Sequence, residues 1–144
     1  MKNYIYIAAI ILVVIISCTT SKAIVSKSDQ AITTQNDTIR IANDELEYEV
    51  IIIDPGFNTW LVSRAFPRDY NSQSFMENKN RFWINEWNTR VLQPFRYDPN
   101  LYGMNIDYNS NIDYGYEVNY LIYNYLVYFQ NTNKQKLFGY VPAR

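Results

Sequence analysis

The sequence predicts an α+β fold, because one strong strand pattern is combined with two helical patterns that do not alternate with further strands. Residues 46–53 first alternate polar and apolar side chains and then become continuously branched and apolar, which is typical of a central strand. Residues 75–92 and 114–130 carry apolar side chains at helical spacing. Residues 38–42 and 136–141 are the candidate partners of the strand, so we expect a small sheet packed against two main helices.

Residues 1–17 have the pattern of a secretory signal peptide: Lys2, an apolar run at 5–16, and the small residue Ser17. The run is shorter than the roughly 20 residues of an ordinary membrane span. Cys18 follows, and the ending Ile-Ile-Ser-Cys resembles a lipobox, the cleavage and lipidation motif of bacterial lipoproteins. The resemblance implies that Cys18 is acylated and becomes the first residue of the mature chain. The alternatives are a cleaved signal with a free thiol and an uncleaved anchor.

Acylation of Cys18 would make membrane lipid a partner and place the protein in the bacterial cell envelope. Thr19 is not the aspartate that, in the best-known sorting rule, retains lipoproteins at the inner membrane, so the resemblance implies the periplasmic face of the outer membrane. Residues 18–37 are polar and free of aromatic side chains, and we expect a flexible tether with a reach of roughly 25 Å. Residues 38–144 are expected to form a single globular domain.

The composition excludes several classes of function. The chain has 13 basic and 14 acidic residues and no histidine; without Lys2 in the signal segment, 12 basic residues face 14 acidic ones, a net charge of −2. Without a basic excess, no nucleic-acid partner is predicted. The lack of histidine, with Cys18 committed to the membrane, excludes histidine-dependent nucleophiles and histidine-ligated zinc. We predict no cofactor and no metal.

The helix boundaries follow from local signals. Residues 54–56, Asp-Pro-Gly, are predicted to stop the first strand as a turn, and residues 57–66 fit either a short strand or a helical turn. Ser74 and Glu77 have the spacing of a capping box, which predicts the start of the first helix. Pro94 is predicted to end it.

The first helix contains two Glu–Arg pairs at i,i+4 spacing. Glu77 and Arg81 lie on its polar side, where we expect an exposed pair. Glu86 and Arg90 are flanked by Trp83 and Trp87 on an apolar face. A carboxylate in such surroundings can have a raised pKa and act as an acid, so this cluster is a candidate site. The alternative is an internal ion pair with the tryptophans in the core.

The second helix, for which Asp113 is the expected N-cap, is apolar on two sides. One stripe is a core pattern: Val118, Leu121, Ile122, Tyr125 and Phe129. The tyrosine stripe on the opposite side comprises Tyr116, Tyr120, Tyr123 and Val127. It could present an aromatic platform for a glycan or a peptide, or it could be a second layer that packs against the long loop at 93–113. We expect Tyr120 to be covered and Tyr116 and Tyr123 to be partly open.

The loop before the second helix contains alternating oxygen-bearing side chains. These match the first four ligand positions of a calcium-binding EF-hand loop: Asp107, Asn109, Asn111 and Asp113. Ile112 stands where that loop requires glycine, and Val118 occupies the position of its bidentate glutamate. The alternative is a run of Asx turns that ends in a helix cap, and this interpretation predicts no metal.

Three segments carry a resemblance to a known family: "YEVIIIDPGFNTWL", "NSQSFMENKNRFWINEWNTRV" and "NIDYNSNIDYGYEVNYLIYNYL". They resemble a family of small bacterial envelope lipoproteins classed as a domain of unknown function, with D-P-G-F…W-L and I-D-Y-G motifs. That resemblance implies an anchor and one domain, and no activity. The leading hypothesis is therefore a non-catalytic module that binds or scaffolds an envelope protein or glycan. The alternative is a carboxylate-dependent hydrolase or glycan-binding enzyme centred on Glu86.

Overall fold

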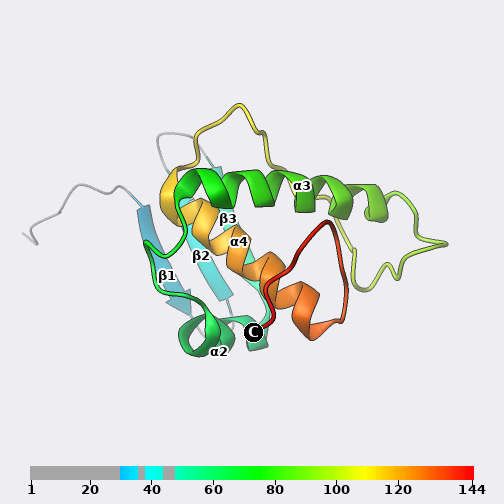
Figure 1. Ribbon diagram of the computed structural model, residues 1–144, viewed down its shortest axis with the longest axis horizontal. Coiled ribbons are helices and arrows are strands. Elements are labelled where there is room, and N and C mark those ends of the chain that lie inside the picture. Colours follow the sequence, from blue (N-terminus) through cyan, green and yellow to red (C-terminus); the bar gives the residue numbers. More distant parts are fainter. Residues whose placement is uncertain (1–29, 36–37, 44–47) are drawn as a thin grey trace, which may run out of the picture.

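The computed structural model describes residues 30–35, 38–43 and 48–144. Cys18, the signal segment and most of the tether lie outside these residues. Within these residues, three strands, β1 (Gln30–Gln35), β2 (Thr38–Asn43) and β3 (Tyr48–Ile53), are followed by three helices, α2 (Pro55–Arg64), α3 (Gln73–Val91) and α4 (Gly115–Thr132). The predicted α+β class is confirmed (Figure 1).

The strands form an antiparallel sheet in the order β1-β2-β3. The strand predicted at 46–53 and its pairing with 38–42 are confirmed within the described residues, with Ile41 opposite Val50. The buried side chains Ile39, Ile41 and Ile52 face the helices. The alternation of covered and exposed positions predicted for the start of β3 continues to its end. The expectation of a central strand with a fully covered second half was wrong, because β3 is an edge strand of the described sheet and Ile51 and Ile53 are exposed.

Two further predictions about the sheet were wrong. Residues 18–37 were predicted to be a flexible tether, but β1 lies inside this segment. Its β-branched residues 32–34 favour a strand. β1 pairs with β2 in a register that places Gln35 opposite Thr38. Residues 136–141 contain no strand. Gly139 has a φ of 62°, which breaks an extended run, and the carbonyl oxygens of Phe138 and Tyr140 accept hydrogen bonds from α3.

The Asp-Pro-Gly segment ends β3 and also begins α2, which resolves the ambiguity at 57–66 in favour of a helix. Asp54 is the N-cap: its carboxylate accepts a hydrogen bond from the Gly56 amide at 2.9 Å, and Pro55 occupies the first turn. The same carboxylate accepts a bond from the Tyr128 hydroxyl at 3.0 Å. Gly56 suits this packing, because a Cβ there would collide with the Tyr128 hydroxyl oxygen.

The two long helices are confirmed, but their caps differ from the predictions. The side chain of Ser72, not Ser74, caps α3 by accepting a hydrogen bond from the Phe75 amide. The N-cap position of α4 is Tyr114, although the carboxylate of Asp113 still accepts a bond from the Gly115 amide at 2.9 Å. Serines two residues apart offer similar capping chemistry, so the sequence alone does not distinguish them.

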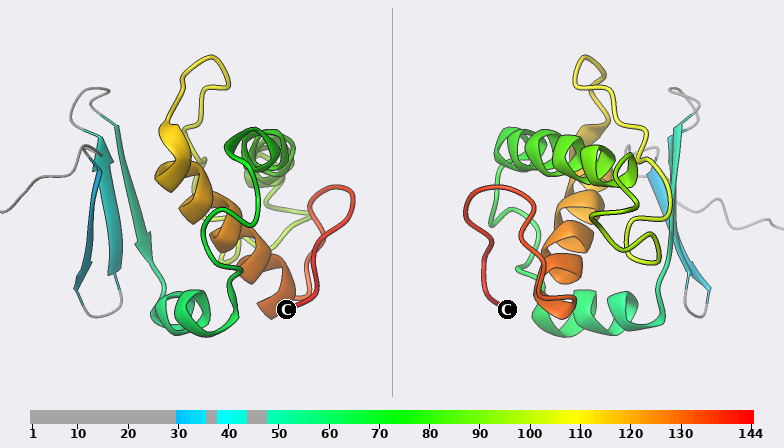
Figure 2. Two further views of the ribbon diagram at one scale, coloured as in Figure 1. Left: turned by 60° about the vertical axis from the view of Figure 1, so that its left-hand side comes forward. Right: turned by 90° about the vertical axis from the view of Figure 1, so that its right-hand side faces the viewer.

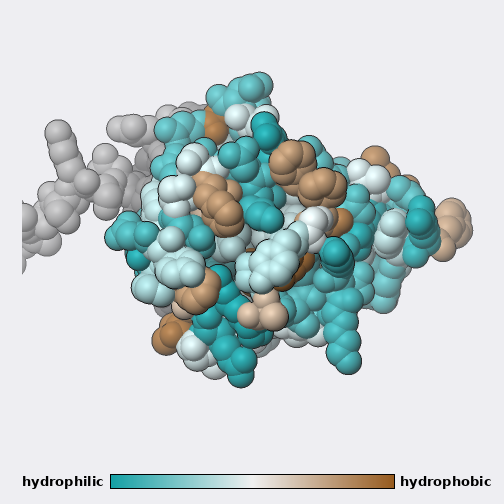
Figure 3. Space-filling model, in the orientation of Figure 1, coloured by the Kyte–Doolittle hydropathy of each residue, from teal (hydrophilic) through white to brown (hydrophobic). Residues whose placement is uncertain are grey.

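The helices and the sheet form layers, with α4 between the sheet and α3 (Figure 2). Almost every residue of α4 from Val118 to Gln130 is buried, and α2 covers one end of the sheet. Burial on both sides of α4 explains why its sequence is apolar on two stripes. On the face seen in Figure 3, hydrophobic and hydrophilic side chains are interspersed. Among the described residues, no helix combines the length and apolarity that a membrane crossing needs.

Candidate functional site

Glu86 and Arg90 form the internal ion pair that the sequence offered as an alternative to an active acid. Arg90 Nε donates to Glu86 Oε1 at 2.8 Å, and the Arg90 side chain is 9% exposed while that of Glu86 is 30% exposed. Arg90 also donates to the Tyr102 hydroxyl at 2.8 Å and to the Lys136 carbonyl at 2.6 Å. Burial opposes the charge, but the bonds to Glu86 and Tyr102 outweigh it and raise the pKa of Arg90.

The two tryptophans beside this pair belong to the core. Trp83 is fully buried, stacks on Tyr123 with ring centroids 5.5 Å apart, and donates its indole N–H to the Phe138 carbonyl at 2.8 Å. Trp87 donates its indole N–H to the Met104 carbonyl at 2.9 Å and packs edge-on against Phe129. Each ring anchors a loop to α3, and neither forms an open platform.

The tyrosine stripe is a second packing layer. Tyr120 and Tyr123 are both buried, so the expectation that Tyr123 would be partly open was wrong; Tyr116 is half-buried. The hydroxyl of Tyr120 donates to the Phe66 carbonyl, and that of Tyr116 accepts from the Asp69 amide. The segment between α2 and α3 therefore covers Tyr116 and Tyr120, and α3 covers Tyr123. Helical periodicity does not reveal these tertiary contacts.

In the loop at 107–113, side-chain oxygens of Asn109 and Asp113 form local turns by accepting hydrogen bonds from nearby backbone amides. The side chain of Asn109 accepts a bond from the Asn111 amide at 2.9 Å, and Asp113 accepts from Gly115 in the same way. Across the residues that the structure describes, no three His, Cys, Asp or Glu side chains cluster as metal ligands do.

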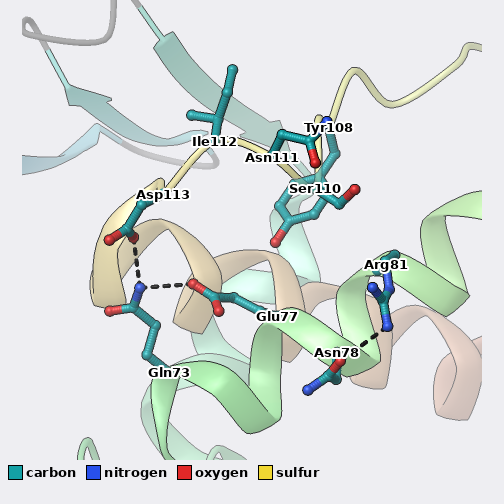
Figure 4. A pocket seen from close by; sticks show the side chains of 9 residues that line it. All are labelled: Gln73, Glu77, Asn78, Arg81, Tyr108, Ser110, Asn111, Ile112 and Asp113. Atoms are coloured by element: carbon teal, nitrogen blue, oxygen red, sulfur yellow. Dashed lines mark hydrogen bonds between the residues drawn. The ribbon is translucent and has the colours of Figure 1, made fainter.

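The structure contains a polar pocket that no pattern in the sequence predicted. A cavity of about 350 Å³ lies between the first half of α3 and the 108–113 loop (Figure 4). Its walls carry charged and hydrogen-bonding side chains: Gln73, Glu77, Asn78, Arg81, Tyr108, Ser110, Asn111, Ile112 and Asp113. Its two walls are separated in the chain by the residues between Arg81 and Tyr108, so no local motif indicates the pocket.

The Gln73 amide organises this pocket. It donates to Glu77 Oε1 and to Asp113 Oδ1, both at 2.7 Å, and so ties α3 to the end of the loop that precedes α4. The predicted Glu77–Arg81 pair is wrong, because Glu77 accepts from Gln73 and Asn119 whereas Arg81 donates to Asn78 at 3.1 Å. The exposed side chain of Arg81 therefore lines the pocket together with the carboxylates of Glu77, one turn earlier in α3, and Asp113. The arrangement suits a polar ligand that both donates and accepts hydrogen bonds.

Two half-buried tyrosines make the fold sensitive to alkali. Burial, reinforced by the nearby carboxylate of Asp54, raises the pKa of Tyr125 to about 12, and burial beside Glu77 raises that of Tyr108 to about 12. An unfolded tyrosine ionises near pH 10. The stability that comes from keeping these hydroxyls neutral is therefore complete below about pH 10 and is lost as the pH rises toward 12.

We predict that Tyr125→Phe moves the midpoint of alkaline unfolding to higher pH, because it removes one group that ionises more readily in the unfolded chain. Circular dichroism from pH 8 to 12.5, read beside tyrosinate absorbance, measures the midpoint. An alkaline midpoint identical to that of the wild type would contradict the assignment.

The chain matches a known protein family over most of its length. A model of a family of unknown function, DUF6146, matches residues 5–142. The chain belongs to this family. The match confirms the resemblance to a domain of unknown function, and it assigns no activity. No curated protein and no solved structure matches the chain.

Proposed function

We propose that the protein is a lipoprotein of the bacterial cell envelope, anchored through acylated Cys18, whose folded domain is a non-catalytic binding or scaffolding module. The observation that carries the proposal is the placement of Cys18 directly after the small Ser17, at the end of the apolar run at 5–16. One acyl chain holds a protein to a bilayer only marginally, whereas two chains hold it stably, so a diacylated cysteine would be a durable anchor.

Two features of the folded domain support a role without catalysis. The domain contains no histidine and no cysteine, the commonest general base and the strongest side-chain nucleophile. The carboxylate on which a hydrolase would depend, Glu86, is bound to Arg90 beside the core tryptophans. The hydrolase alternative required Glu86 in a pocket with a second carboxylate, and the observed pairing favours the scaffold.

The anchor is tested with Cys18→Ala. We expect the wild type to carry label from a clickable fatty acid and to sediment with membranes, and the variant to lose the label and either stay unprocessed or leave the membrane fraction. Ser17→Ala is the matched control, because it keeps a small residue at the cleavage position and should remain labelled. An unlabelled wild type whose mass shows no acyl addition would refute the anchor.

The choice between scaffold and hydrolase is tested with Glu86→Gln, which keeps the shape of the side chain and removes its charge. In crosslinking of the intact envelope, a scaffold should retain the same crosslinked neighbours in this variant. Loss of hydrolysis of an envelope glycan on the same substitution would support the enzyme instead.

A further inference from the structure

The outer edge of β3 is unpaired within the described part of the chain. The sheet order β1-β2-β3 places β3 at one side, so β2 satisfies the backbone groups of only one of its edges. Among the described residues, no backbone hydrogen bond from another segment reaches residues 48–53 on the other edge. Such an edge presents a row of N–H and C=O groups that can pair with another extended chain.

A groove runs along this edge. It has a volume of about 550 Å³ and is lined by every residue of β3 on one side and by residues 104–107 on the other. The side chains of Trp87, Ile122 and Tyr125 also line it, from α3 and α4. We call this feature the edge groove. Its apolar lining next to unpaired backbone matches sites that bind a peptide by adding a strand, where pockets receive alternate side chains.

The wall opposite β3 is held in place by side chains of α3 and β3. Trp87 binds the Met104 carbonyl, and Asn88 brackets Ile106, donating to its carbonyl at 2.9 Å and accepting from its amide at 2.8 Å. The Tyr48 hydroxyl donates to the Asp107 carbonyl at 3.0 Å and ties this wall to β3 at one end. A groove bounded on both sides admits one extended chain more readily than the edge of a second folded copy.

The chemistry of the rim indicates what that chain carries. The charged side chains among the residues lining the edge groove are Glu49 and Asp107, both acidic, and Arg40 already pairs with Glu49. The side chain of Asp107 is exposed and makes no hydrogen bond within the described residues. Exposed apolar side chains, Ile51, Ile53 and Met104, flank the groove. Charge complementarity therefore favours a lysine or arginine beside Asp107, next to apolar residues at alternate positions.

We propose that the edge groove binds an extended segment of a partner protein, which adds to β3 as a fourth strand, packs alternate apolar side chains between the exposed Met104 and the half-buried Tyr125, and sets a basic residue against Asp107. This inference rests on the proposed binding role but not on acylation of Cys18. A failure of the anchor would therefore leave the groove intact, and a failure of the groove would leave the acyl label unchanged.

The test is selection of a random decapeptide phage library on the full-length protein immobilised in detergent, followed by titration of the most enriched peptide. We expect enriched sequences to alternate apolar and polar residues and to contain lysine or arginine. Met104→Glu should weaken that peptide at least tenfold, whereas Leu92→Glu should not. Met104 and Leu92 are equally exposed, at 75%, and Leu92 lies outside the groove, so the pair separates local from general effects.

Two further measurements test the strand pairing and the charge. A peptide N-methylated at alternate residues should not bind, because methylation removes the donors that β3 needs, and Asp107→Asn should weaken binding severalfold at low salt. Enriched peptides without alternation, equal binding of the N-methylated peptide, or unchanged affinity of Met104→Glu would each overturn the proposal. Concentration-dependent dimerisation that displaces the peptide would assign the groove to a second copy of this chain and overturn it equally.

Discussion

Arg90→Ala is expected to lower the free energy of unfolding by about 3–5 kcal/mol, which is the cost of breaking a buried ion pair from one side. The guanidinium contacts three parts of the molecule at once: Glu86 in its own helix, Tyr102 in the loop after α3, and the Lys136 carbonyl near the C-terminus. It also lies over the Tyr97 ring, 4.8 Å from its centroid. Removing the guanidinium leaves the Tyr102 hydroxyl and the Lys136 carbonyl without their charged hydrogen-bond donor.

The two partners are not equivalent, and this asymmetry sharpens the test. The Glu86 side chain is 30% exposed, so water can hydrate its carboxylate when Arg90 is removed, whereas the Arg90 side chain is only 9% exposed. We therefore expect Glu86→Ala to cost less than Arg90→Ala. Replacing both by apolar residues should recover part of the loss, since no charge remains buried.

Urea denaturation of the two single variants and the double variant measures the coupling between the side chains. Arg96→Ala is the control, because Arg96 is exposed and also lies over Tyr97; it should change stability by about 0.5 kcal/mol or less. A coupling below about 0.5 kcal/mol would identify Glu86–Arg90 as an ordinary surface pair.

The contrast between these arginines also shows what periodicity can predict. Helical spacing places Glu86 and Arg90 within reach of each other, and the flanking tryptophans indicate burial; both inferences depend on neighbours within one helix. The same reasoning applied to Glu77 and Arg81 failed, because Gln73 and Asn119 compete for the Glu77 carboxylate. Asn119 comes from α4, and no pattern within α3 reports its approach.

The same limit explains the errors in the sheet and the candidate site. β1 was not predicted because its sequence is mostly polar and its pairing with β2 is a tertiary contact, whereas β3 carries its own apolar run. The polar pocket joins Gln73 to Asp113, and the edge groove joins β3 to Trp87 and Ile122. Each site is created by packing between distant segments, so neither has a local sequence signature.

The second large effect is expected from the tyrosine stripe, where packing and partner binding predict opposite results. Tyr123→Ala should destabilise the fold by about 3–5 kcal/mol, because it removes a large buried ring. Tyr123 is 2% exposed, stacks on Trp83, and meets Phe75 edge-on with ring centroids 6.0 Å apart. Its loss would open a cavity between α3 and α4, which the rigid indole cannot fill without giving up its bond to Phe138.

Tyr140→Ala and Tyr116→Ala complete the series. Tyr140 is 74% exposed, so its truncation should change stability by about 0.5 kcal/mol or less and report the general cost of losing a tyrosine. Tyr116 is half-buried and fixes the 69–71 segment through bonds to Asp69 and Asn71, so it should fall between the other two. Thermal and urea unfolding of the three variants ranks them. The opposite outcome would be a Tyr123→Ala protein whose free energy of unfolding lies within about 1 kcal/mol of the wild type but which loses an envelope crosslink. That result would make the stripe a partner surface, because truncating a side chain that supports the core must lower the free energy of unfolding.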